Sequence, residues 1–311
     1  RCVAVDPFNR DRVYCGTSGN GVWWSEDGGG TWQAVGEGVG YDEVTAVAVS
    51  PVEEESGLGV VYVGTEPSRV FRSVDGGASW EEQSGLTELP SADSWSFPPK
   101  PYTHHVRWIE ADPHVEGRIF VCIEAGALVR SLDGGETWVD RVPGGPYDTH
   151  TLATHVRAAG RVYSAAGDGY FESYDGGESW EQPMAGLRHR YVVGLAVDPA
   201  DPDVIVVSAA SSPRRAYNAG VAESYLYRRA GEEPWEAIGE GLPAPEGMTI
   251  NIPASHPAEP GVFYSANNHG VYRSSDAGLS WSQLDIEWPQ AYRSQRVQAV
   301  AVVVRKMENN V

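Results

Sequence analysis

The chain has 311 residues, of which 43 are acidic and 23 basic, and its formal net charge at pH 7 is −20. Hydrophobic residues make up 41% of the sequence, which is enough for a sizeable core and excludes a wholly disordered chain. No apolar run approaches 18 residues and no basic patch is available to neutralise phosphates, so a membrane-spanning helix and a nucleic-acid-binding protein are excluded.

The bias among the charged residues has two explanations. Lys100 and Lys306 are the only lysines, so nearly all the basic residues are arginine. A dense acidic surface with almost no lysine is expected of a soluble, halophilic protein, and a GC-rich genome explains the arginine excess equally well. Both explanations stay open.

The three cysteines, Cys2, Cys15 and Cys122, are too few and too scattered for a disulfide framework or a zinc site. A reducing cytoplasm is therefore the simplest expectation. Secretion is left open, because the chain starts at Arg1 rather than at a methionine.

A short segment recurs along the chain. SEDGGGTW ends at Trp32, SVDGGASW at Trp80, SLDGGETW at Trp138, SYDGGESW at Trp180 and SSDAGLSW at Trp281. A degenerate copy ends at Trp235, between the last two. Because these tryptophans are 42 to 58 residues apart, the chain is built from repeats of about 50 residues.

Each repeat predicts four short strands. The first strand is apolar and ends near a proline, as in Val44–Pro51, Val106–Pro113 and Val192–Pro199. Two more strands lead into the recurring segment, and a fourth begins at its tryptophan. Four strands per repeat, separated by turn residues, predict the blades of an all-β propeller.

We expect one propeller domain over residues 1–311, with six blades that each carry a tryptophan. Their approximate bounds are 1–40, 41–84, 105–142, 147–184, 190–239 and 248–285. Residues 296–304, which include the apolar run Val297–Val304, predict a closing strand. This strand favours seven blades, one of them incomplete because the chain lacks its natural start, and six blades are the alternative.

The recurring segment resembles the Asp-box (BNR) repeat, S-x-D-x-G-x-x-W, within the wider group of WD40/YVTN-like propeller repeats. Sialidases, sortilin-type receptors and a photosystem II assembly factor carry such repeats, so the resemblance implies a fold and no single activity. In each hairpin we expect the glycines to adopt positive φ, the tryptophan to pack into the blade and the aspartate to accept hydrogen bonds from turn N–H groups. These structural aspartates are Asp27, Asp75, Asp133, Asp175 and Asp276.

The first strands of a propeller line its central channel, so the residues at their starts should meet at one mouth. Most residues equivalent to Arg107 are polar, which predicts a polar ring there. The position of Glu110 is alanine in every other copy, and a carboxylate buried alone would cost several kcal/mol. The alanines are Ala4, Ala48, Ala153, Ala196, Ala254 and Ala301.

Charged and aromatic residues gather at the predicted starts of the third, fourth and fifth blades and in nearby loops. The candidate catalytic residues are Arg107, Glu110, Glu124, Asp148 and His150. The candidate ligand-binding residues are His104, His105, Asp168, Arg188, His189, Arg190, Tyr191, Asn268 and His269. No cofactor is certain, and a divalent metal held by His105 and His150 is the one candidate.

These residues favour binding of a small anionic or carbohydrate-like ligand at the channel entrance, together with glycoside hydrolase or metal-dependent lyase chemistry. A sialidase is disfavoured, because the Arg-Ile-Pro element of that family is absent. The alternative is a non-catalytic scaffold or assembly factor with a protein partner. An insertion at Ser84–Tyr102 would then be a contact loop or a lid, with Trp95 and Phe97 exposed on it.

Overall fold

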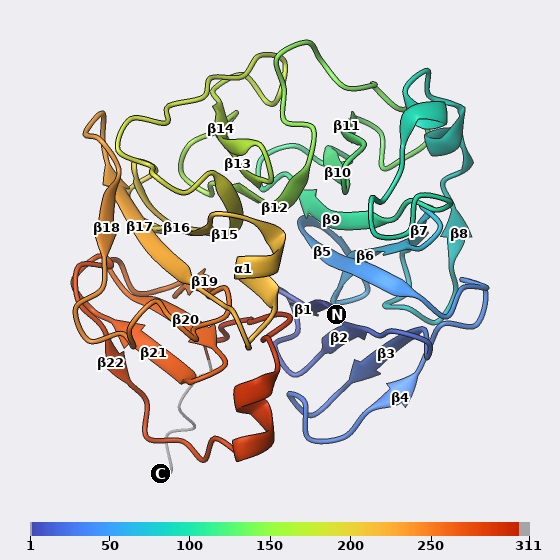
Figure 1. Cartoon of the computed structure of the whole chain (residues 1–311). Coiled ribbons are helices and arrows are strands. Elements are labelled where there is room, and N and C mark those ends of the chain that lie inside the picture. The colour runs from blue at the N-terminus through green and yellow to red at the C-terminus, as the bar shows by residue number, and fades with distance from the viewer. Residues whose placement is uncertain (1, 305–311) are drawn as a thin grey trace.

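A computed structural model describes residues 2–304, and its sheets are arranged as six blades around a central axis (Figure 1). Within each blade consecutive strands pair antiparallel. The first blade contains β1 (Cys2–Val5), β2 (Val13–Gly16), β3 (Val22–Ser25) and β4 (Gln33–Ala34). The second contains β5 (Val44–Glu55), β6 (Leu58–Thr65), β7 (Val70–Ser73) and β8 (Glu81–Glu82).

The third and fourth blades have three strands each, and an isolated bridge stands in the place of the fourth strand. The third contains β9 (Val106–Ala111), β10 (Ile119–Ile123) and β11 (Ala127–Ser131). The fourth contains β12 (Thr149–Thr154), β13 (Val162–Ala166) and β14 (Gly169–Ser173). The bridges are Arg130 with Val139 and Glu172 with Glu181.

The last two blades again have four strands. The fifth contains β15 (Tyr191–Val197), β16 (Val204–Ala210), β17 (Ser224–Ala230) and β18 (Glu236–Ile238). The sixth contains β19 (Ile252–Ser255), β20 (Phe263–Asn267), β21 (Gly270–Ser274) and β22 (Ser282–Gln283). The predicted all-β propeller is confirmed, with six blades; a seventh is not.

Residues 296–304 are not a strand. The apolar sequence suits a strand, but within residues 2–304 no neighbouring strand pairs with this segment, and pairing is what defines a strand. The segment nevertheless reaches the channel, since Gln298, Ala299 and Val300 line it beside the first strands of the blades.

The helices are short: η1 (Ser84–Glu88), η2 (Ala92–Ser94), α1 (Pro213–Tyr217) and η3 (Gln290–Ser294). None of those in the described part of the chain is long and apolar enough to cross a membrane. In Figure 1, α1 lies over the centre of the ring.

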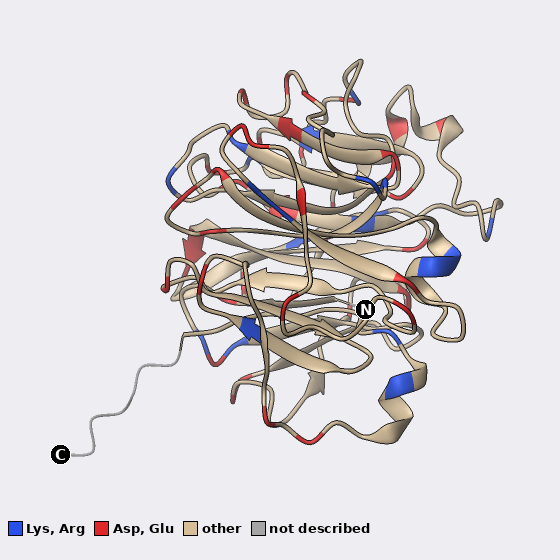
Figure 2. Cartoon of the chain, turned by 60° about the vertical axis from the view of Figure 1, so that its left-hand side comes forward, with Lys and Arg blue, Asp and Glu red and all other residues tan. Residues whose placement is uncertain are grey.

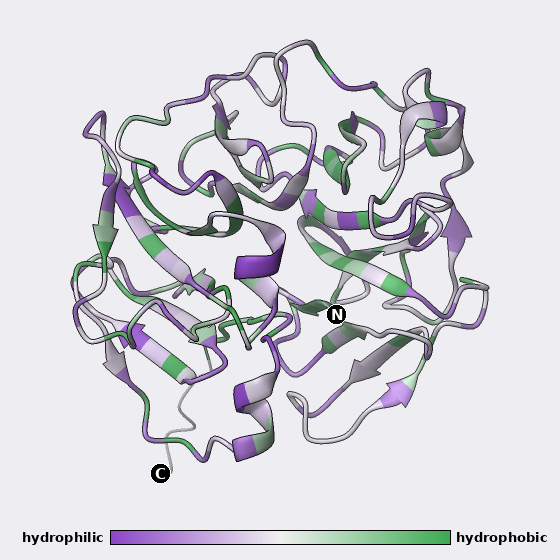
Figure 3. Cartoon of the chain, viewed as in Figure 1, coloured by the Kyte–Doolittle hydropathy of each residue, from purple (hydrophilic) through white to green (hydrophobic). Residues whose placement is uncertain are grey.

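Successive blades pack against each other through apolar interfaces, which we call seams, and each seam contains the tryptophan of the later blade. Trp80 packs with Val39 and Val44, and its indole N–H donates to the carbonyl of Val35 in the first blade at 2.8 Å. Trp138, Trp180, Trp235 and Trp281 occupy the next four seams. Trp32 in the first blade differs, because it is 40% exposed. Hydrophobic residues concentrate on the strands that meet at these seams (Figure 3).

The hairpins share one hydrogen-bond pattern, which the third blade illustrates. The hydroxyl of Ser131 donates to Oδ1 of Asp133 at 2.8 Å and accepts from the N–H of Gly135 at 2.8 Å. Asp133 also accepts from the N–H of Thr137 at 2.8 Å. The same bonds recur at Asp27, Asp75, Asp175 and Asp276. Bonds from turn N–H groups and hydroxyls lower the pKa of Asp27 to about 2.

The insertion before the third blade packs against the fold. The prediction that Trp95 is exposed is wrong: it is 5% exposed, and its indole N–H donates to Ser91 Oγ at 3.0 Å. Ser91 is held in turn by Asp140, which accepts from its backbone N–H at 2.8 Å. The apolar ring gains more from burial than the loop loses by being ordered. Phe97 stays half-buried and contacts His105 edge to face.

The serine of a hairpin should contribute measurably to stability. Replacing Ser131 by alanine leaves the buried N–H of Gly135 without its acceptor, so we expect S131A to lower the free energy of unfolding by about 1–2 kcal/mol in urea titrations. The control is S211A, at an exposed serine, with an expected change within about 0.5 kcal/mol. Equal stability of the two variants would contradict the role assigned to the hairpin.

Candidate functional site

A cavity of about 360 Å3 opens at the channel mouth, and we call it the entrance pocket. Its wall combines residues from the starts of first strands with residues from loops far away in the sequence. From blades two to five it takes Thr45, His105, Arg107, Glu124, Ala125, Asp148 and Tyr191. From the insertion, the α1 segment and the C-terminal segment it takes Phe97, Pro98, Pro99, Lys100, Pro213, Tyr217, Arg296 and Gln298.

Strand pairing explains why these residues meet. Arg107 and Tyr191 lie at the starts of β9 and β15, Asp148 directly precedes β12, and Glu124 directly follows β10. In an antiparallel pair the start of one strand and the end of the next lie at the same edge. Four blade-borne side chains are thus brought to one end of the channel.

Glu124 is the most connected acid of the pocket. His105, which is 3% exposed, contacts its Oε2 through Nε2 at 2.9 Å, and Arg107 Nε lies 3.3 Å from the same oxygen. Burial alone would raise the pKa of Glu124, but the hydrogen bond from His105 and the charge of Arg107 outweigh it and lower the pKa to about 2. Glu124 is therefore a carboxylate throughout the neutral range.

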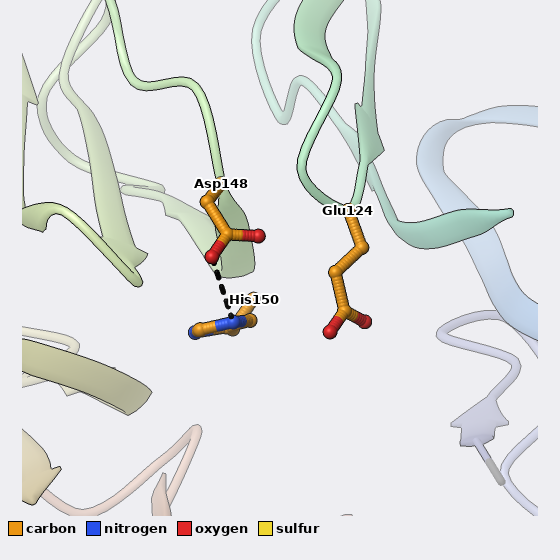
Figure 4. A group of neighbouring side chains, drawn as sticks. All are labelled: Glu124, Asp148 and His150. Carbon is orange, nitrogen blue, oxygen red and sulfur yellow. Dashed lines mark ion pairs between the residues drawn. The ribbon is translucent and has the colours of Figure 1, made fainter. Parts of the chain in front are cut away.

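Asp148 and His150 lie beside Glu124. Asp148 accepts a hydrogen bond from the N–H of Ala125 at 2.8 Å, which ties the fourth blade to the third. His150 is fully buried, and its Nδ1 is 2.7 Å from the carbonyl oxygen of Val192. One ligand atom each from Glu124, Asp148 and His150 lie within 4.8 Å of one another (Figure 4).

The other side of the pocket is aromatic and basic. The hydroxyl of Tyr191 donates to that of Tyr217 at 3.2 Å, and the guanidinium of Arg296 lies 4.2 Å from the ring centre of Tyr217. Burial raises the pKa of both tyrosines, so both stay protonated. Lys100 lies at the rim and pairs with Glu66 at 2.9 Å.

Acidic residues are otherwise scattered over the visible loops and strands rather than gathered in one patch (Figure 2). The protein has a formal net charge of −20, yet three basic side chains line the entrance pocket. They are Lys100, Arg107 and Arg296.

Five of the residues proposed from the sequence line the entrance pocket: His105, Arg107, Glu124, Asp148 and Tyr191. His150 lies behind this wall, with its ring edge-on to that of Tyr191 at 4.8 Å. His104 does not line the pocket and packs edge-on to Trp95 at 5.6 Å.

The remaining candidates lie apart from the pocket wall. His189 stacks on Tyr225 at 4.1 Å, and Arg188 and Arg190 on either side of it are exposed. Asn268 accepts a hydrogen bond from the N–H of Thr249, and His269 Nε2 is 3.3 Å from the carbonyl oxygen of Gly247. Asp168, whose pKa burial raises, is also outside the pocket lining.

Glu110 lies in a different cavity. This second cavity, of about 470 Å3, occupies the channel itself and is lined mainly by apolar first-strand residues. Glu110 accepts from the indole N–H of Trp108 at 3.2 Å and from the N–H and hydroxyl of Thr154 at 3.1 and 2.9 Å. Burial raises its pKa to about 7, although these bonds act against the rise. Arg107, three residues before it on the same strand, lines both cavities and contacts Glu124.

Sequence reasoning missed Tyr217 and Arg296 as pocket residues. Tyr217 ends α1, which also carries Arg214 and Arg215. Arg296 lies outside every repeat, in the segment that follows η3. The tyrosine had a weak local signal. Arg296 had a positional one, because it begins the predicted closing strand 296–304, but it was not named as a candidate.

No protein-family model matches the chain, and no curated protein matches it. Solved structures do resemble it. An ancestral GH74 enzyme matches with a TM-score of 0.67 and 19% sequence identity, and the match covers 90% of this chain and 38% of the enzyme. The GH74 enzyme of Niastella koreensis matches with a TM-score of 0.67 and 16% identity, and this match covers 94% of this chain and 47% of the enzyme. This chain therefore spans less than half of either enzyme.

A structure of YCF48 bound to D1 peptide has a TM-score of 0.62 and 16% identity, over 92% of this chain and 82% of its own. YCF48 from Cyanidioschyzon merolae has a TM-score of 0.61 and 14% identity, over 91% and 84%. At these identities the likeness establishes the β-propeller fold and leaves the activity to be argued from the site.

The raised pKa of Glu110 predicts a pH-dependent stability. The carboxyl of Glu110 loses its proton near pH 4.3 in the unfolded chain and near pH 7 in the folded protein. Its contribution to the stability of the folded protein is therefore full below about pH 4.3 and is lost as the pH rises through about 7. Replacing Glu110 by alanine, the residue of the other blades, removes that loss. We expect the free energy of unfolding of E110A, relative to the parent, to rise by about 2–3 kcal/mol from pH 5 to pH 8.

Urea titrations at several pH values measure this difference, and E37A, at an exposed acid, controls for the change in net charge. A difference between E110A and the parent that stays flat over this range would show that Glu110 is ionised already at pH 5.

Proposed function

We propose that the entrance pocket binds a small anionic, carbohydrate-like ligand. The observation that carries the proposal is that Arg107, Arg296, Tyr191 and Tyr217 line one cavity, with the guanidinium of Arg296 4.2 Å from the ring centre of Tyr217. Guanidinium groups bind carboxylates through paired hydrogen bonds, and tyrosine supplies both an apolar ring face and a hydroxyl.

The size of the pocket supports a small ligand. Its volume of about 360 Å3 is at the lower end of the range for small-molecule sites. A mono- or disaccharide that carries a carboxylate suits such a volume. Phe97 and Lys100 of the insertion lie at the rim of the pocket.

Binding is favoured over hydrolysis by the state of the acids. Glycosidases need one carboxyl group that keeps its proton near neutral pH, as general acid, beside one that is ionised. Glu124 is held ionised by His105 and Arg107, so it suits the second role only. Glu110, whose pKa burial raises to about 7, lies in the other cavity.

A scaffold that binds a peptide is the second candidate. The observation in its favour is the fold neighbour YCF48, whose structure is bound to D1 peptide. Phe97, Pro98 and Pro99 at the rim of the pocket offer an apolar surface to such a chain.

We also propose that the repeats belong to the Asp-box (BNR) class. The hairpin bonds of Ser131, Asp133 and Gly135, repeated in the other blades, support this assignment, because the motif residues are the ones that hold the turn.

Calorimetric titration with digalacturonate and with neutral cellobiose tests the ligand class. We expect the uronate to bind and the neutral sugar to bind more weakly, and R296Q to weaken uronate binding about 10- to 100-fold because a charge-assisted hydrogen bond is lost. R188Q is the matched control, since Arg188 is an exposed arginine outside the pocket lining.

Equal binding of the two sugars, or equal loss in R296Q and R188Q, would overturn the proposal. Binding of a proline-containing peptide that R296Q weakens, without binding of the uronate, would favour the scaffold.

A further inference from the structure

We propose that Glu124, Asp148 and His150 bind a divalent metal ion in the wall of the entrance pocket (Figure 4). One ligand atom from each residue lies within 4.8 Å of the others. Oxygen and nitrogen ligands bind such ions at about 2.0–2.2 Å, which places neighbouring ligand atoms about 3–4 Å apart. A small rotation of the two carboxylates would therefore close the site.

The environment of His150 is the independent observation that points to a cation. The ring is fully buried, and its Nδ1 faces the carbonyl oxygen of Val192 at 2.7 Å, so Nδ1 must carry the proton and donate it. In the neutral ring Nε2 is then an acceptor. Among the described residues no hydrogen-bond partner reaches Nε2, and the nearest charged group is Oδ2 of Asp148 at 3.7 Å.

Nε2 of His150 is buried and faces a carboxylate on the pocket wall that is only 24% exposed, and two acceptors in such a place are unfavourable unless something positive lies between them. A metal ion would satisfy both. Metal-binding histidines commonly donate their second N–H to a backbone carbonyl, which fixes the tautomer, and the contact of His150 with Val192 is such an arrangement.

His105 is a positioning residue in this proposal rather than a ligand. Its Nε2 contacts Oε2 of Glu124 at 2.9 Å, and Arg107 contacts the same oxygen at 3.3 Å. Both contacts fix the orientation of the carboxylate. The sequence-based pair of His105 and His150 is thus replaced by one histidine and two carboxylates.

The donor set selects the class of metal. One imidazole nitrogen and two carboxylate oxygens suit a transition ion such as Zn2+ or Mn2+, whereas Ca2+ prefers oxygen ligands alone. Glu124 and Asp148 also line the entrance pocket, so coordination positions of the metal would face a ligand there. The site stands on its own contacts and does not depend on the proposed sugar ligand.

The test uses the whole chain, stripped with a chelator and titrated calorimetrically with Zn2+, Mn2+ and Ca2+ in the absence of any organic ligand. We expect one equivalent of Zn2+ or Mn2+ to bind and Ca2+ to bind at least 100-fold more weakly. D148N and H150Q should each weaken Zn2+ binding at least 100-fold. H114Q is the control, because His114 contacts the carbonyl oxygen of His155 and lies outside the three-residue group.

Circular dichroism checks the folding of every variant. D148N keeps the size of a side chain on the pocket wall, so it remains informative if the buried His150 variant does not fold. Zn2+ binding that is unchanged in D148N would overturn the proposal, because the ion would then be held elsewhere on the acidic surface.

Absence of binding would overturn it too. In that case a 15N spectrum with both ring nitrogens of His150 protonated would identify a proton, rather than a metal, as the charge that faces Asp148. Either result leaves the anion-binding proposal untouched, because no sugar is present in the titration.

Discussion

The packing of one indole ring into each seam between blades is the contact on which the rest of the molecule depends. Trp80 belongs to the second blade by sequence but bonds to the carbonyl of Val35 in the first, and Trp235 bonds in the same way to Pro183. In these two seams the large ring fills an apolar space and its N–H still finds an acceptor, whereas Trp138 and Trp281 fill theirs without a hydrogen-bond partner among the described residues. Because each blade is held against the one before it, the starts of β9, β12 and β15 converge although they are about 40 residues apart in the sequence.

That convergence creates a place where charges act strongly. Glu124 has a histidine and an arginine on one oxygen, and both contacts are largely shielded from water. Shielding strengthens each attraction, which is why the carboxylate stays ionised despite its burial. Glu110 lies on the same strand pair but accepts three hydrogen bonds from neutral groups and has no ion pair among the described residues. For this acid burial outweighs the hydrogen bonds, so its pKa is raised. The difference between these two acids follows from their neighbours alone.

The features predicted well from sequence are those made by local contacts. The hairpin around Asp133 involves residues at most four positions apart, so its motif is sufficient to specify it. Blade number depends on how the ring closes, and this involves pairing over the whole chain, which no motif records. Arg107 and Glu110 were both assigned to the channel entrance because they lie on the predicted first strand of the third blade, but three residues of a strand span about 10 Å, enough to separate the channel mouth from its interior. Arg296 came from outside the repeats, where periodicity carries no information.

More than half of the residues that line the entrance pocket come from the insertion, the α1 segment and the C-terminal segment. Six similar blades would produce a nearly symmetric channel. The second cavity is close to such a channel, because the first strands of all blades line it, largely with valines and alanines. The channel mouth is different, because three segments outside the blade strands line the same pocket as Glu124, which lies beside His150. They are the insertion with Phe97, the helix that ends at Tyr217 and the segment with Arg296. Stability would not require such one-sided additions, since each of them orders a loop. Local breaks in an otherwise consistent pattern are expected where a protein binds something, which is why the pocket, rather than the more regular channel below it, carries the functional proposal.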